Sequence, residues 1–436
     1  MTKPTINVWQ HRFAVFTALA TLGLVGMGGL VTSHGVGMAV PDWPTSYGYN
    51  MFALPVSTWL TGGIFHEHTH RLWAAFVGVL VVALTRWMGG SKSRVPLMMI
   101  GAAEILLGFA FLKIGPDWKG AGHFLSGIGS VVLLGGIVWV KNAPSAERLP
   151  MLGWAAFWLV QLQGLLGGLR VVLDSQVVAD VRLGTVFGIV HGCLAQGFLV
   201  LLAVIALMTS RWWVECVFIS SSSSSSSSKS SRKIEDEDED EDESEDDKVL
   251  HLTRSASLRR WFLLTTLLIF VQLLIAATMR HQHAGLAISD FPLAHGELWP
   301  DMSAEAVANY NARRVDVTTS NPITAFQIGL QMTHRIVACL ILVAVAVCAW
   351  KARMIQSIKP LAFAWLGLIL VQVGLGAWTI WSNKAADVAT AHVVVGALSL
   401  VTGALGCLIF FRRQAVSAAS PEVPFSETNS TDRASA

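Results

Sequence analysis

The chain has 436 residues, of which 53% are hydrophobic and 14% are charged, and its mean hydropathy is +0.54. This composition excludes an ordinary soluble domain and is typical of a polytopic membrane protein. The net charge of +2 is the sum of a basic body and one acidic run, residues 235–247, which holds twelve of the 29 acids. We expect the lipid bilayer to surround this chain, and we expect no nucleic-acid partner.

A helix that crosses a bilayer needs about 20 mostly apolar residues. Ten segments satisfy this requirement: residues 13–33, 63–85, 96–113, 122–140, 151–172, 183–208, 261–279, 325–349, 361–381 and 388–410. The sequence therefore predicts an all-α membrane protein with ten crossings.

The positions of Lys and Arg predict the orientation, because they gather in alternate loops and cytoplasmic loops are the basic ones. Residues 13–70 contain neither Lys nor Arg, which places the loop around Asp42 outside, whereas Arg313 and Arg314 are exceptions on that side. We expect a bacterial inner-membrane protein with both termini in the cytoplasm. Its short N-terminal segment resembles a lead-in rather than a cleaved signal.

A low-complexity segment divides the chain. Residues 220–228 are all Ser and the acidic run follows them, so this region cannot bury apolar area. We predict a disordered cytoplasmic linker over 213–255, with an acidic docking segment as the alternative. The predicted domains are an N-terminal bundle at 1–212, a C-terminal bundle at 256–413 and a disordered tail at 414–436.

The two halves resemble each other, which predicts a pseudo-symmetric architecture with corresponding sites. Four landmarks match: 37–48 with 285–296, 69–71 with 333–335, Gln163 and 166–167 with Gln372 and 375–376, and His191 with His392. The offset between the halves falls from 264 residues at His70 to 209 at Gln163, so the first half carries an insertion between them. We assign residues 96–140 to an inserted transmembrane hairpin and predict two four-helix bundles.

Each four-helix unit has one His near the outer end of its second helix and another in the first turns of its fourth. Two helices that each present an imidazole inward can hold a haem iron from both faces. We predict two bis-histidine haem sites near the outer surface, His70 with His191 and His334 with His392. For any single His the alternative is a bond to a neighbouring helix, but four at equivalent places favour ligation.

Other polar residues near these positions have two interpretations each. Arg71 and Arg335 follow the ligand candidates and either meet a haem propionate or snorkel to the membrane edge. His66 and His68 flank Glu67 off the His70 face, and His123 has no counterpart in the second half, which favours packing. The remaining outer-loop histidines either cover haem edges or face water: His34, His281, His283 and His295.

The halves differ three residues before the Arg-paired His, where the first has Glu67 and the second has Gln331. This spacing puts the carboxylate on the same helical face as His70. A buried carboxylate can accept protons or stabilise positive charge, which favours a reactive site in the first half and an electron-transfer site in the second. A helix-start Glu that pairs with Arg71 is the structural alternative.

These motifs resemble the heme A synthase family, which acts in cytochrome oxidase maturation. The resemblance rests on GMAVPDWPTSYGYNMF, EHTHR, QGLLGGLR, IVHGCLAQ, MRHQHAGLAISDFP, QMTHR and TAHVVVGAL, and leaves out only 90–148, 213–255 and the C-terminal tail. Members commonly have eight helices, and some have a cysteine pair in the first outer loop, which this chain lacks.

The resemblance implies oxidation of a methyl group of haem O to a formyl group, giving haem A. By position it implies that His70 and His191 hold the substrate haem, with Arg71 beside them and Glu67 as the catalytic carboxylate. His334, His392 and Arg335 would hold a haem b that passes electrons. It also implies a haem O synthase as supplier, and it allows a homo-oligomer, whereas the electron acceptor stays undefined.

Two other classes remain open from the residues. A di-haem b-type cytochrome for quinone-linked electron transfer explains four histidines but gives Glu67 no role. A repeat-based transporter would have interrupted helices around a midplane site, whereas the ionisable residues here cluster near one surface.

Overall fold

The computed structural model describes residues 7–115, 118–138, 148–179, 181–214, 245–313, 322–356 and 358–418, without side chains at 245–255 and 413–418. Ten helices in this part of the chain are long and apolar enough to cross a membrane. They are α1 (Val8–Ser33), α3 (Gly62–Gly89), α4 (Ser91–Ile114), α5 (Lys119–Ile137), α6 (Leu149–Val172), α7 (Leu183–Met208), α9 (Glu245–His281), α11 (Ala325–Ala352), α12 (Lys359–Trp381) and α13 (Ala386–Ala418). The prediction of an all-α membrane protein with ten crossings is confirmed.

The remaining elements are short and lie in the connections between these helices. They are η1 (Met51–Ala53), α2 (Val56–Trp59), the antiparallel pair β1 (Val177–Val178) and β2 (Val181–Arg182), η3 (Ala284–Leu286) and α10 (Ala304–Arg313). The edges of the predicted disordered segments differ, because α9 begins at Glu245, inside the predicted linker, and α13 continues to Ala418, inside the predicted tail. Residues 245–260 contain neither Gly nor Pro, so nothing in them stops the helix at the membrane edge. Most of the linker and tail lies outside the described residues.

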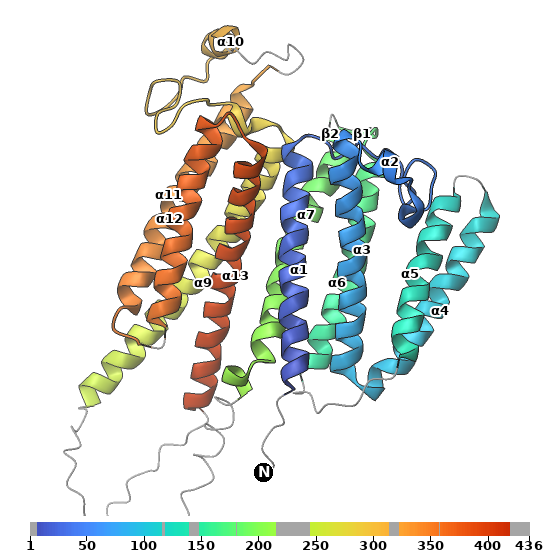
Figure 1. Cartoon of the computed structure of the whole chain (residues 1–436). Helices are drawn as coiled ribbons and strands as arrows, with labels where there is room; N and C mark the ends of the chain where they lie inside the picture. Colours follow the sequence, from blue (N-terminus) through green and yellow to red (C-terminus); the bar gives the residue numbers. More distant parts are fainter. Residues whose placement is uncertain are drawn as a thin grey trace, which may run out of the picture.

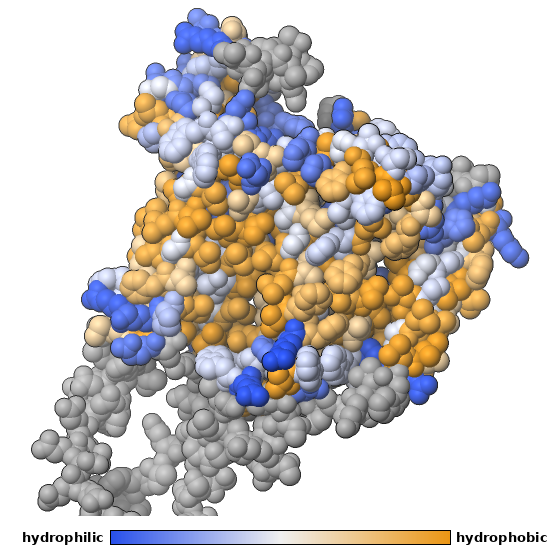
Figure 2. Space-filling model, viewed as in Figure 1, coloured by the Kyte–Doolittle hydropathy of each residue, from blue (hydrophilic) through white to orange (hydrophobic). Residues whose placement is uncertain are grey.

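The long helices form two groups of four, with α4 and α5 at one edge (Figure 1). The first group is α1, α3, α6 and α7, and its buried core includes Val77, Leu84 and Leu202. The second is α9, α11, α12 and α13, around Phe262, Trp365 and other residues. On the face seen in Figure 2, an apolar band covers the helices and polar surface lies at both of their ends, as a bilayer requires.

The two groups meet through α1 and α13, and glycines allow the close approach. A Cβ on Gly29 would lie 3.1 Å from Cγ2 of Thr390 on α13. Near the C-terminal end of α1, Arg280 Nη2 of α9 donates to the Gly29 carbonyl and to Ser33 Oγ, each at 2.5 Å. The halves are therefore joined by helix packing and by a guanidinium, independently of the linker.

The inserted pair α4 and α5 packs on itself through glycines, since a Cβ on Gly101 would lie 2.6 Å from the Gly129 carbonyl oxygen. Gln161 Nε2 of α6 donates to Glu104 Oε1 of α4 at 2.7 Å. Phe124 of α5 packs against Trp43 in the loop between α1 and α3, with ring centroids 4.4 Å apart and the ring planes tilted by 52°. The hairpin thus contacts both the first group of helices and the loop that precedes α3.

Candidate functional site

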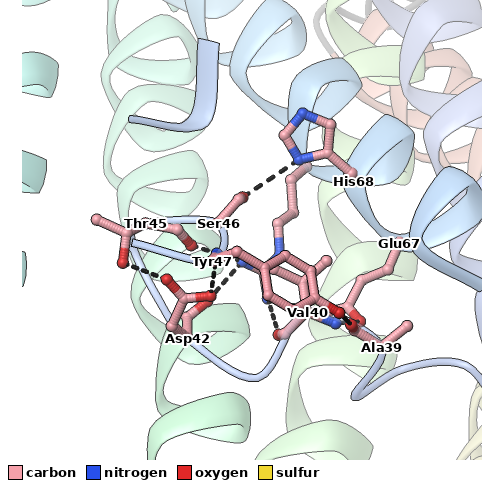
Figure 3. Close-up of polar contacts among 9 residues, drawn as sticks. Ala39, Val40, Asp42, Thr45, Ser46, Tyr47, Glu67 and His68 are labelled. Atoms are coloured by element: carbon pink, nitrogen blue, oxygen red, sulfur yellow. Dashed lines mark hydrogen bonds and ion pairs between the residues drawn. The ribbon is translucent and has the colours of Figure 1, made fainter. Parts of the chain in front are cut away.

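The loops that precede α3 and α11 have the same internal hydrogen bonds. Asp42 accepts from the backbone N–H groups of Tyr47 at 2.7 Å and Gly48 at 2.9 Å (Figure 3). In the second half, Asp290 accepts from His295 N–H at 2.7 Å and Gly296 N–H at 2.8 Å. Tyr47 and His295 both have φ of +54°, and the glycines that follow also have positive φ. The repeat found in the sequence therefore extends to backbone conformation.

Asp42 is held ionised by these contacts. Its partial burial opposes ionisation, but donors from Gly48, Thr45 and Tyr47 outweigh burial and hold the pKa of Asp42 below its ordinary value of 3.8. Thr45 Oγ1 contributes a hydrogen bond of 2.5 Å. The carboxylate is thus the centre around which the first loop turns.

The arginines after the ligand candidates bind these loops to their helices. Arg71 donates to the carbonyls of Asp42 at 2.7 Å, Val40 at 2.8 Å and Thr45 at 3.1 Å. Arg335 donates to the carbonyls of Asp290 at 2.7 Å and Leu293 at 2.8 Å. Neither of the two roles expected for these arginines, propionate binding or snorkelling, accounts for these bonds.

Glu67 and Gln331 complete the attachment in an equivalent way. Glu67 Oε2 accepts from Val40 N–H at 2.8 Å, and Gln331 Oε1 accepts from Ile288 N–H at 2.7 Å. The residues are 4% and 3% exposed. Glu67 Oε1 also pairs with Arg71 Nη2 at 2.7 Å, whereas the amide nitrogen of Gln331 donates to the Ile288 carbonyl at 3.2 Å. The structural alternative for Glu67, a pair with Arg71, is therefore present.

The four histidines predicted as haem ligands share one unusual feature, an unpaired ring nitrogen. Nδ1 is buried without a hydrogen-bond partner in each of them, namely His70, His191, His334 and His392. The rings themselves are only half-buried, so they retain accessible surface elsewhere. Leaving a buried polar atom unpaired is unfavourable by about 1–3 kcal/mol, and the same state at four equivalent positions fits imidazoles that bind a further group.

The spacing of the second pair fits an iron between two imidazoles. His334 and His392 have ring centroids 6.4 Å apart. Metal–nitrogen bonds of about 2 Å put the centroids of two opposed imidazoles about 6 Å apart. Gln372 Nε2 lies 3.3 Å from His392 Nε2. In the first pair, His70 and His191 are close enough to interact electrostatically.

Glycines face three of the four rings. A Cβ on Gly28 of α1 would lie 3.2 Å from His70 Cε1, and one on Gly167 of α6 would lie 3.4 Å from His191 Cε1. A Cβ on Gly376 of α12 would lie 3.2 Å from His392 Cε1. These glycines let the Cε1 edge of each imidazole come close to a neighbouring helix, so a Cβ at Gly28 or Gly376 would press on the ring and one at Gly167 would touch it.

The other histidines lie away from these pairs or contact only one of them. His68 Nδ1 is 3.2 Å from Ser46 Oγ, and His66 stacks on His34 with ring centroids 4.4 Å apart. His295 stacks on Tyr310 at 3.7 Å. His123 and His283 are exposed, whereas His281 packs against Gly188 of α7 in the first half.

Two kinds of residue near the site were not assigned a role from the sequence. The glycines opposite the rings served only to align the two halves of the repeat, because a sequence does not show which side chain from another helix a glycine contacts. Arg170, in the last turn of α6, lies against Gly37 of the first outer loop. The sequence does mark Arg170 as a difference between the two halves of the repeat, since the second half has Thr379 at the corresponding position.

The described residues contain no cluster of three or more His, Cys, Asp or Glu side chains suited to a bare metal ion. They do contain paired, half-buried imidazoles whose Nδ1 atoms are buried without a partner, which fit axial ligation of haem iron. Fold and site thus define a polytopic helical membrane protein with two equivalent histidine pairs. The sequence pattern of COX15-CtaA, cytochrome oxidase assembly protein, matches residues 122–404, more than half of the chain, and the chain belongs to that family.

Two relatives carry the name Heme A synthase. The one from Caulobacter sp. (strain K31) is 29% identical over 148 residues, which is 33% of this chain and 40% of the relative. The one from Wolbachia pipientis subsp. Culex pipiens (strain wPip) is 31% identical over 157 residues, 35% of this chain and 41% of the relative. The matched regions therefore span about two fifths of the length of these relatives.

Proposed function

We propose that this protein is a heme A synthase that oxidises the methyl group of haem O to the formyl group of haem A by successive hydroxylations. The observation that carries the proposal is the set of four half-buried imidazoles in two equivalent pairs, each with a buried Nδ1 that has no hydrogen-bond partner among the described residues. Membership of the cytochrome oxidase assembly family and the names of the two relatives support the same activity.

In this proposal the two halves have different tasks. His70 and His191 hold the substrate haem O, and His334 and His392 hold a haem b. A haem iron with two axial imidazoles supplies one-electron transfer. Helix contacts between the halves hold the two pairs side by side in one assembly.

Glu67 is proposed as the catalytic carboxylate of the first half. Val40 N–H and Arg71 hold its two oxygens in place one helical turn from His70. A fixed negative charge at that place can stabilise positive charge that develops on the substrate, or accept a proton from it. Arg71 has the further task of keeping the outer loop closed over this end of the helix.

The proposal places the protein in a bacterial inner membrane, with both termini in the cytoplasm and both haem sites near the outer side. Haem O would come from a haem O synthase.

The test is expression of the full chain with a source of haem O, followed by extraction and chromatographic separation of the haems. Native protein is expected to yield hydroxylated and formyl haem. Glu67→Gln is expected to lower the yield about 100-fold or more, the lower end of what an acid–base group contributes. The absence of oxidised haem with the native chain would refute the proposal, and equal yield with Glu67→Gln would refute the role of Glu67.

A di-haem b-type cytochrome for quinone-linked electron transfer is the second candidate. The observation that favours it is that Gln331 makes the same loop contact as Glu67, so Glu67 is not in itself proof of chemistry. His334→Ala tests the haem b site independently of which function is correct. The amount of bound haem b should decrease in this variant under either proposal. Unchanged haem spectra in that variant would remove the second haem site.

A further inference from the structure

The end of α6 places a guanidinium beside the first histidine pair with nothing bound to it. Arg170 is half-buried, and among the described residues it makes no hydrogen bond and no ion pair. It is close enough to His70 and to His191 to interact with both electrostatically. A partly buried guanidinium is unfavourable unless an anion pairs with it.

The nearby carboxylates do not fill this need. Glu67 and Asp174 attract Arg170 electrostatically, yet the only ion pair found in the described part of the chain joins Glu67 to Arg71. Both oxygens of Glu67 are already taken by Arg71 and by the backbone N–H of Val40. Arg170 is therefore a cation that Glu67 cannot pair with and that forms no ion pair with Asp174 in the described part of the chain.

The first outer loop is shaped to admit this side chain. A Cβ on Gly37 would lie 2.3 Å from Arg170 Nη2 and 3.0 Å from Cζ, so no other residue type fits there without moving the guanidinium. The corresponding Gly285 in the second half has nothing within 4 Å of its Cβ position. Because residue 379 is Thr rather than Arg, the arrangement belongs to the first half alone.

From these contacts we infer that Arg170 binds a carboxylate of the ligand held by His70 and His191, which under the proposed function is a propionate of haem O. Arg71 cannot take this role while its nitrogens are bonded to Glu67 and to three loop carbonyls. A guanidinium matches a carboxylate in a two-bond geometry, which makes it both an anchor and a guide to orientation. Arg170 thus positions the ligand without acting on the carbon that is oxidised.

The experiment measures binding, not turnover. The full chain, purified with haem b in its C-terminal half, is titrated with haem O and with haem O dimethyl ester, in which both propionates are blocked. Native protein should bind haem O more tightly than the ester. Arg170→Gln should weaken haem O binding about 10- to 100-fold, the range of a charge-assisted hydrogen bond, and leave ester binding unchanged.

Arg182→Gln is the matched control, because Arg182 is exposed on β2 at the start of α7. It should retain native preference for the free acid, and Arg170→Lys should retain part of it. If Arg170→Gln still prefers the free acid as native protein does, or loses affinity for acid and ester equally, the inference is wrong. A native chain that prefers the acid through Arg170 but forms no oxidised haem would refute the proposed function and leave this inference standing.

Discussion

Glu67 and Gln331 bind the same backbone N–H of their respective loops, at 2.8 and 2.7 Å. An amide and a carboxylate of nearly equal shape can thus perform the structural task. The difference between them is the charge of Glu67, which Arg71 balances at 2.7 Å. For this reason Glu67→Gln removes the charge and the ion pair with Arg71 while it keeps the loop contact that Gln331 makes in the second half.

The glycines opposite the histidines lead to a prediction about single residues. Gly376→Ala should weaken haem b binding about tenfold, because the new methyl group pushes on His392 and overpacking of this kind costs about 1–3 kcal/mol. Haem b occupancy of purified protein, measured from its absorbance spectrum, tests this.

Gly374→Ala is the control on the same helix, since nothing lies within 4 Å of its Cβ position. Ala also favours the helical conformation. Equal haem occupancy in the two variants would mean that Gly376 does not position His392.

At the scale of elements, the outer loops are attached by side chains to the helices that follow them. Three carbonyls of the first loop converge on Arg71 and two of the second converge on Arg335. Both loops also turn around an Asp. Each loop therefore covers the outer end of a helix that carries a predicted haem ligand, and its order should depend on these charges.

Acidification should loosen the first loop. The pKa of Asp42 is lowered on folding, so its stabilising contribution is complete above its ordinary pKa of 3.8 and is lost as the pH falls through the lowered value. Limited proteolysis of the outer loops in detergent, followed over pH by mass spectrometry, should show faster cleavage within 37–50 at the acid end.

Asp42→Asn should bring faster cleavage of that loop already at neutral pH, because an amide accepts the three donors less strongly than a carboxylate. Cleavage rates in Asp42→Asn that equal those of native protein at neutral pH would mean that the charge does not hold the loop.

At the scale of the molecule, the two groups of four helices meet through α1 and α13 (Figure 1). Arg280 adds a side-chain hydrogen bond between the groups. We expect these contacts to hold the two groups together even when the linker is cut. A protease site placed in 220–228 should allow cleavage of the assembled protein while the two halves still purify together.

Gly29→Leu should separate the cleaved halves, because even a Cβ at this position approaches Thr390 to 3.1 Å. Gly78→Leu is the control, since its Cβ position is open. Halves that separate without any substitution would show that the linker, not the helix interface, holds the protein together.

The sequence alone determined the ten crossings, because a bilayer demands apolar segments of one length and these are visible in any chain. It also determined the repeat and the two histidine pairs, since equivalent residues recur at fixed landmarks. The break in the repeat at Glu67 was equally visible, although its meaning was not.

Only the tertiary structure decided what each charged group touches. Arg71 is committed to loop carbonyls, Glu67 shares a backbone contact with Gln331, and Arg170 is left unpaired beside His70 and His191. These partners are backbone atoms and glycine surfaces on other elements, which leave no mark in the residue types of a sequence. Hydrogen bonds are short and directional, so a role that depends on them is fixed only when the chain brings distant atoms within about 3 Å.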